Sequence, residues 1–207
     1  MKSLENYKVI LWDFDGVILD SMAIRDQGFV EVLKKYPEVQ VNELLAYHRK
    51  NGGLSRYVKF RYFFEEIRGE EISNDSVNGL AEQFSNVMKL LLINPSLLIS
   101  DSLNFIVENA RRYKMHIVSG SDGNELRYLC EQLDIDQYFL TIDGSPTPKK
   151  QLVKSVLSQF GYAQEDCVLI GDSINDFEAA ESNSVDFMGF NNSDLMDMGT
   201  SYIKGFK

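Results

Sequence analysis

The sequence predicts an α/β fold: a Rossmann-like, three-layer core with a parallel sheet, interrupted early by an inserted all-helical cap. Two patterns predict it. Beyond Pro95, short apolar runs of strand length alternate with helical segments, which is typical of βαβ units in a parallel sheet. Another apolar run, Val9-Ile10-Leu11-Trp12, lies near the start of the chain, and about 80 residues without a clear strand follow it. The first strand is therefore separated from the rest of its sheet by a helical insert.

The insert is expected to consist of helices separated by breaks. The first helix ends before Pro37, because proline cannot continue a helix. Gly52-Gly53 and Ser73-Asn74-Asp75 interrupt the segment that follows, and Pro95 closes it. The first helix carries the apolar residues Met22, Phe29, Val30 and Leu33, and the later segments are Leu44–His48, Tyr57–Ile67 and Val77–Leu92.

The core is expected to alternate between strands and helices. Its strands are predicted at residues 8–13, 115–119, 138–142, 167–171 and 185–190, and its helices at 102–113, 125–133, 150–160 and 175–181. The predicted division places residues 1–20 and 96–207 in the core and 21–95 in the cap.

Composition limits the class of protein. A chain of 207 residues that is 44% hydrophobic suits one folded domain, or one domain that carries a smaller one. The net charge of −10 argues against nonspecific binding to nucleic acid or to an anionic membrane. It does not exclude an anionic substrate, because a metal ion can reverse the local field. The sequence has no apolar heptads, so a monomer is compatible with it and the oligomeric state stays open.

Three features bear on cellular location. Cys130 and Cys167 lie in separate apolar stretches without metal-binding spacing, as expected of reduced core cysteines in a reducing compartment. Residues 1–8 are too polar for a signal peptide. No apolar run reaches the ~18 residues of a membrane span. The expected location is the cytoplasm.

Polar residues gather at the ends of the predicted strands. Asp13 and Asp15 follow the first strand, and two carboxylates this close are costly without a cation or a proton between them. The other groups are Ser119-Gly120-Ser121-Asp122 after the second strand, Lys149-Lys150 near the third, and Gly171-Asp172-Ser173-Ile174-Asn175-Asp176 after the fourth. Ligands of open parallel sheets bind beyond the carboxyl ends of the strands, so these groups are expected to share one crevice.

Each group also has a purely structural interpretation. Asp13-Phe-Asp15-Gly16 is also a common turn or calcium-loop fragment, although the distal glutamate of an EF-hand is missing. Asp122 and Asp176 stand where helix caps are expected. One of the two lysines is expected to be solvated. The four groups together, each at a strand end, favour a functional site.

These motifs, in this order, resemble those of the haloacid dehalogenase superfamily of phosphotransferases. The pair Asp13-Phe-Asp15-Gly-Val and Gly171-Asp172-Ser-x-x-Asp176 carries most of the resemblance, which extends over nearly the whole chain. The core with its early insert is similar to members with a small helical (C1-type) cap, in the branch of phosphoglycolate phosphatase and β-phosphoglucomutase. The resemblance implies a hydrolase that acts on phosphoric monoesters.

The resemblance also implies roles for individual residues. Asp13 is the expected nucleophile, and Asp15 the acid that protonates the leaving oxygen and then the base that deprotonates water. The dehalogenase branch lacks the second aspartate, so its presence favours phosphate chemistry. The Ser119 hydroxyl would hold the phosphoryl oxygens, and Lys149 would neutralise Asp13 and the transferring group. The family often has Lys-Pro here and this chain has Lys-Lys, so Lys150 remains an alternative.

The resemblance implies a divalent cation as well. A negatively charged carboxylate can approach a phosphate dianion only when their mutual repulsion is shielded. Mg²⁺ is the oxygen-preferring ion for that role. Its expected ligands are the Asp13 carboxylate, the Asp15 backbone carbonyl and the Asp172 carboxylate. Asp176 either binds the ion directly or supports one of its ligands.

The cap is expected to close over the crevice and contact the leaving group. Gly53 and Arg56 are the favoured contacts, because a flexible Gly52-Gly53 turn comes shortly before a cation. The other candidate cations are Arg25, Arg49, Lys50, Lys59 and Arg61, and His48 and His116 are expected in core or surface roles.

The resemblance favours one reaction over others. Sugar-phosphate mutases of the family often have a histidine where this chain has Arg25, so a phosphatase for a small phosphorylated metabolite is favoured over a mutase or a phosphonate-cleaving hydrolase. A catalytically idle binding or regulatory protein would be expected to lack one of the motif residues, and all are present. The identity of the substrate stays open.

Overall fold

The computed structural model describes residues 2–206 and contains one six-stranded parallel sheet. The strands lie in the order β3-β2-β1-β4-β5-β6. They are β1 (Val9–Trp12), β2 (Lys114–Asp122), β3 (Thr141–Ser145), β4 (Cys167–Gly171), β5 (Asp186–Phe190) and β6 (Ser201–Ile203). The first strand pairs with both β2 and β4, so Trp12 lies opposite Ile117 on one side and Ile170 on the other. Strand order changes direction beside β1, which places the switch point at the carboxyl end of this strand.

The two faces of the sheet are covered by different helices. In β1, Ile10 and Trp12 face one side, which α5 (Ser100–Asn109) and α6 (Gly123–Gln132) cover, and Val9 and Leu11 face the other, which α7 (Lys149–Phe160) and α8 (Ile174–Glu181) cover. All four residues of β1 are buried, as expected of a central parallel strand. The predicted three-layer α/β fold is therefore confirmed.

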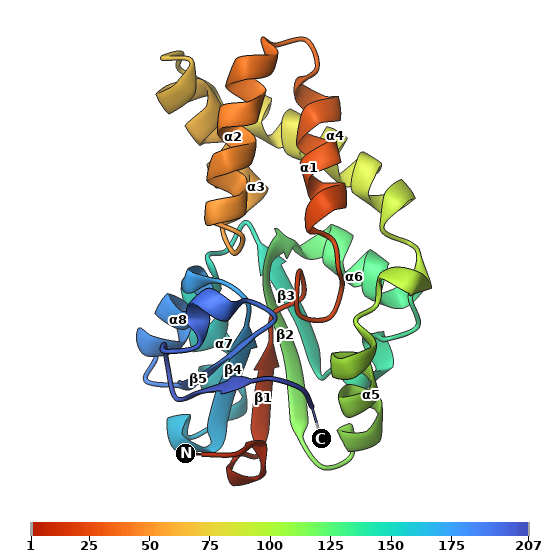
Figure 1. Ribbon diagram of the computed structural model, residues 1–207, viewed down its shortest axis with the longest axis vertical. Helices are drawn as coiled ribbons and strands as arrows, with labels where there is room; N and C mark the ends of the chain where they lie inside the picture. Colours follow the sequence, from red (N-terminus) through yellow and green to blue (C-terminus); the bar gives the residue numbers. More distant parts are fainter. Residues whose placement is uncertain (1, 207) are drawn as a thin grey trace.

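The helices between β1 and α5 lie beyond the carboxyl end of the sheet (Figure 1). They are α1 (Met22–Leu33), α2 (Glu38–Lys50), α3 (Arg56–Tyr62), which continues as a π-helical turn over Phe63–Ile67, and α4 (Asn74–Leu91). Phe29, Phe60 and Phe84 meet at their centre, with ring centroids 4.5 to 6.2 Å apart. We call residues 21–95 the cap and the remainder the core. The exact division of the chain into these two parts remains a prediction.

Some elements differ from the sequence-based prediction. The third strand lies at Thr141–Ser145 instead of 138–142, because Asp136–Tyr138 form a 3₁₀ turn and Phe139 packs against the core before the strand starts. Strand β2 continues beyond the predicted end at Ser119 to Asp122, which pairs with Ser145, so Gly120, Ser121 and Asp122 lie within the strand and not after it. The edge strand β6 was not predicted, since three residues are too few to show a period. Among the described residues 2–206, no helix is both long enough and apolar enough to cross a membrane.

Candidate active site

The motif residues meet at the carboxyl end of β1. Asp13 follows this strand directly, and its backbone N–H donates to the carbonyl of Ile170 at 2.9 Å. Gly16 turns the chain with a φ of +75°, and a Cβ at this position would lie 2.0 Å from a carboxylate oxygen of Asp172. Only glycine permits both the positive φ and this approach. The turn therefore brings the loop after β1 against the loop after β4.

Three buried or half-buried carboxylates form a cluster in this crevice. Asp13, Asp172 and Asp176 each place an oxygen within 4.8 Å of the others. Burial, then repulsion from Asp176, raises the pKa of Asp13 to about 7, although Lys149 opposes the shift. Burial and repulsion from Asp13 likewise raise the pKa of Asp172 well above its usual value. Carboxylates so arranged are stabilised by a divalent cation, and oxygen donors of this kind fit a hard ion.

Lys149, the first residue of α7, lies inside this cluster. Its ammonium group donates to Asp13 Oδ1 at 2.7 Å and also to Asp176 Oδ1. Lys150 is exposed, so the structure brings Lys149 and not Lys150 to the carboxylates. The second oxygen of Asp176 accepts hydrogen bonds from the backbone N–H and the hydroxyl of Ser173, at 3.0 and 2.6 Å. Asp176 thus caps α8 and binds Lys149, and protein donors engage both of its oxygens.

Asp15 has a different environment from Asp13. It accepts hydrogen bonds from the Ser21 hydroxyl, from Arg25 Nε at 2.6 Å and from the Ser121 hydroxyl at 2.5 Å. Burial alone would raise the pKa of Asp15, but the charge and hydrogen bond of Arg25, helped by the two serines, outweigh it and lower the pKa. Although Asp13 and Asp15 are only two residues apart, the pKa of Asp13 is raised and the pKa of Asp15 is lowered.

The second strand contributes the opposite wall of the crevice. The Ser119 hydroxyl is buried and accepts the backbone N–H of Ser121 at 3.1 Å. Ser119, Gly120 and Ser121 line the same cavity as Asp13 and Asp15. A Cβ on Gly120 would lie 2.3 Å from the carbonyl oxygen of Gly53, so the cap turn rests directly on this strand. The predicted cap residue Gly53 is thus part of the cavity wall.

The cap closes the cavity with cationic and aromatic side chains. Of the predicted candidates, Arg25, Arg56 and Lys59 line it, and Phe29, Phe84 and His48 lie beside them. Arg49 pairs instead with Asp26, and Arg61 with Glu65. The free volume of this cavity is about 30 Å³.

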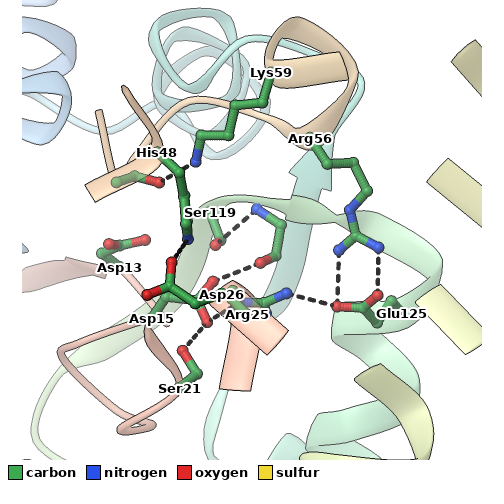
Figure 2. A network of polar contacts seen from close by, with 12 residues as sticks. Asp13, Asp15, Ser21, Arg25, Asp26, His48, Arg56, Lys59, Ser119 and Glu125 are labelled. Atoms are coloured by element: carbon green, nitrogen blue, oxygen red, sulfur yellow. Dashed lines mark hydrogen bonds and ion pairs between the residues drawn. The ribbon is translucent and has the colours of Figure 1, made fainter. Parts of the chain in front are cut away.

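A buried ion network joins the cap to the core, and Figure 2 shows it. Arg56 donates to both oxygens of Glu125, at 2.5 and 2.8 Å, and Arg25 donates to Glu125 at 3.0 Å. The Glu125 side chain is fully buried. No local signal in the sequence identifies the partners of Glu125, which are distant along the chain. The charge of Arg56, a predicted substrate contact, is therefore already balanced within the protein.

The chain is similar to a known protein family and to curated proteins. A profile of the family described as haloacid dehalogenase-like hydrolase matches residues 10–190. A phosphoglycolate phosphatase from Colwellia psychrerythraea is 22% identical over 192 residues, which cover 90% of this chain and 85% of that protein. A 5'-nucleotidase from Pseudomonas aeruginosa is 26% identical over 188 residues, covering 88% and 82%.

Solved structures show the same fold. β-Phosphoglucomutase from Clostridium difficile superposes with a TM-score of 0.77 at 15% identity, covering 96% of this chain and 91% of that one. CbbY from Rhodobacter sphaeroides, in complex with xylulose-(1,5)bisphosphate, has a TM-score of 0.77 at 14% identity and covers 97% and 95%. The family profile spans most of the chain, including both of its most specific motifs. The chain therefore belongs to the haloacid dehalogenase-like hydrolase family.

Proposed function

We propose that this protein is a Mg²⁺-dependent phosphatase that hydrolyses a small phosphorylated metabolite through an aspartyl-phosphate intermediate on Asp13. One observation carries the proposal: Asp13 and Asp15 line one cavity, the first beside Lys149 and the second beside Arg25. Only Oδ1 of Asp13 accepts a hydrogen bond from the described residues 2–206, so Oδ2 is available as a nucleophile. The family membership and the two named phosphatase relatives support the same chemistry.

The first step would transfer the phosphoryl group to Asp13. The carboxylate oxygen attacks phosphorus, and the bond between phosphorus and the leaving oxygen breaks as that oxygen takes a proton from Asp15, which would have gained it from water in the second step of the preceding turnover. The Ser119 hydroxyl and nearby backbone N–H groups would hold the phosphoryl oxygens. Lys149, 2.7 Å from Asp13, balances charge on the nucleophile.

The second step would hydrolyse the acyl phosphate. Asp15 takes a proton from water, the water oxygen attacks phosphorus, and the bond between phosphorus and Asp13 breaks. Arg25 favours the carboxylate form of Asp15 that this step requires. One group would thus serve as acid and then as base.

The acidic cluster fits a divalent cation. Mg²⁺ would be held by the carboxylates of Asp13 and Asp172 and the backbone carbonyl of Asp15, and it would shield the phosphate charge from the nucleophile. Asp176 would act through Lys149, since both its oxygens accept hydrogen bonds from the protein.

The proposal extends to organisation and location. Residues 21–95 would form a cap that excludes water from a core made of residues 1–20 and 96–207. Both cysteines are buried and free, which supports a reducing compartment such as the cytoplasm.

The direct test is release of phosphate from p-nitrophenyl phosphate. Wild-type protein should release it only with Mg²⁺, and Asp13→Asn should lower the rate by ~10³-fold or more, because the nucleophile is lost. Asp75→Asn, an exposed aspartate of α4, is the matched control. Full activity of Asp13→Asn, or none in the wild type, contradicts the proposal. A mutase would instead need a bisphosphate activator and yield an isomer in place of free phosphate.

A further inference from the structure

The cap wall of the cavity carries a buried positive charge that no carboxylate of residues 2–206 pairs with. Arg25 and Arg56 form ion pairs with Asp15 and Glu125, but Lys59 forms none among the described residues. Lys59 is 3% exposed, and its ammonium group makes one hydrogen bond, to the carbonyl of Gly52 at 3.1 Å. Since an ammonium group has three N–H donors, two remain for a ligand.

Other unused donors line the same cavity. Neither ring nitrogen of His48 has a hydrogen-bond partner in the described part of the chain, and its Nε2 lies 3.8 Å from Asp26 Oδ1, beyond hydrogen-bonding distance. Arg25 Nη2 is also buried without a partner there. In Figure 2 the side chains of Lys59 and His48 extend from the cap toward Asp13 and Asp15.

Unpaired polar groups of this kind are costly to bury, and a buried cation costs most. Burial, followed by repulsion from Arg25, lowers the pKa of Lys59 to about 7. An anion bound beside Lys59, His48 and Arg25 Nη2 would supply the missing acceptors. Proteins seldom retain such a cluster without a ligand, because an apolar residue would fill the space at lower cost.

We propose that Lys59, together with His48 and Nη2 of Arg25, forms a subsite for a second anionic group, one carried by the leaving group of the substrate. The inference rests on the proposed phosphatase function. The phosphoryl group would lie on the core wall against Asp13 and Ser119, and the second anion on the cap wall. The substrate class is a phosphate monoester whose alcohol portion is itself an acid.

The size of the cavity limits the length of that alcohol. The free volume of the cavity is about 30 Å³, and Phe29 and Phe84 line it on the cap side. A leaving group of a few atoms that ends in a carboxylate suits this space better than a nucleoside or a hexose. A carboxylate is therefore the expected anion, with a second phosphate as the bulkier alternative.

Binding of non-hydrolysable analogues tests the subsite without catalysis. Titration calorimetry with Mg²⁺ would compare phosphonoacetate, which carries a carboxylate, with ethylphosphonate, which carries none, and with methylenediphosphonate, which carries a second phosphonate. Wild-type protein should bind phosphonoacetate ~10- to 100-fold more tightly than ethylphosphonate, as expected for hydrogen bonds to a charged group. Tighter binding of methylenediphosphonate than of phosphonoacetate would identify the second group as a phosphate.

Lys59→Met should abolish the preference for phosphonoacetate over ethylphosphonate. The control is Lys50→Met, which changes an exposed lysine at the end of α2 and should keep this preference. In turnover, Lys59→Met should lower kcat/KM for 2-phosphoglycolate by ~10- to 100-fold, mainly through KM, and should lower it much less for p-nitrophenyl phosphate, whose leaving group carries no carboxylate. Equal binding of phosphonoacetate and ethylphosphonate by the wild type overturns the inference, whatever the variants do. Equal losses on both esters in Lys59→Met overturn it too. If the wild type hydrolyses no ester, the phosphatase proposal fails, while the binding comparison still decides whether the subsite exists.

Discussion

Glu125→Gln is expected to destabilise the protein more than any exposed substitution on the same helix. The Glu125 side chain is fully buried and accepts three hydrogen bonds from Arg56 and Arg25, at 2.5, 2.8 and 3.0 Å. Glutamine keeps the shape but replaces one acceptor by an N–H donor and removes the negative charge. Arg56 then remains as a buried cation with no carboxylate partner among the described residues.

The magnitude follows from this geometry. Removing one partner of a buried ion pair costs about 3–5 kcal/mol. The lower end is expected here, because Asp15 still neutralises Arg25. With a urea m-value of about 3 kcal/mol/M for a chain of this size, a loss of ~3 kcal/mol lowers the unfolding midpoint by ~1 M.

Urea denaturation measures the shift with two probes. Trp12 is the single tryptophan of the chain and is buried in β1, so its fluorescence reports the core, and circular dichroism reports the helices. Glu131→Gln, exposed on the same helix, is the control and should leave the midpoint unchanged. Arg56→Met combined with Glu125→Gln should cost less than the sum of the two single changes, because the uncompensated charge is gone. A midpoint for Glu125→Gln equal to that of the control would refute the reasoning.

Three further outcomes are expected. Gly120→Ala should raise KM for p-nitrophenyl phosphate, because its Cβ would lie 2.3 Å from the Gly53 carbonyl and displace the cap turn; Gly79→Ala, where a Cβ meets nothing within 4 Å, should not. Burial lowers the pKa of His116 to about 4. Below pH ~6.5 the imidazole of His116 therefore binds a proton in the unfolded chain, whereas in the folded chain it stays neutral down to about pH 4. Stability should therefore fall as the pH drops from about 6.5 toward 4, and less steeply in His116→Gln, as urea midpoints at several pH values would show. Chelation by EDTA should abolish phosphate release and added Mg²⁺ restore it; activity that persists in EDTA would exclude the proposed metal role.

Much of the core could be predicted from the sequence, because its information is local. A strand buried on both faces is apolar throughout, as Val9–Trp12 is, and the polar residues that follow mark the end of the strand. Parallel strands bring such ends to one edge, so the convergence of Asp13, Ser119 and Asp172 with one of the two adjacent lysines did not require coordinates. The errors lie where local signals are weak: the start of β3 and the three-residue strand β6.

The environment of each site residue required the tertiary structure. The two lysines are adjacent in sequence, but α7 is oriented so that Lys149 is buried against Asp13 while Lys150 is exposed to solvent. Arg25 and Asp15 meet because α1 begins just above the turn after β1.

By itself, the sequence determined the parallel α/β core, the helical insert and the motif residues at the strand ends, because periodic burial and turn residues are properties of contiguous segments. Only the tertiary structure decided which charges are neutralised. Glu125 is 69 residues from Arg56 and 100 from Arg25, and their pairing depends on how the cap packs on the core. That packing leaves Lys59 buried beside a small cavity without a carboxylate partner among the described residues, and no local pattern could have indicated it.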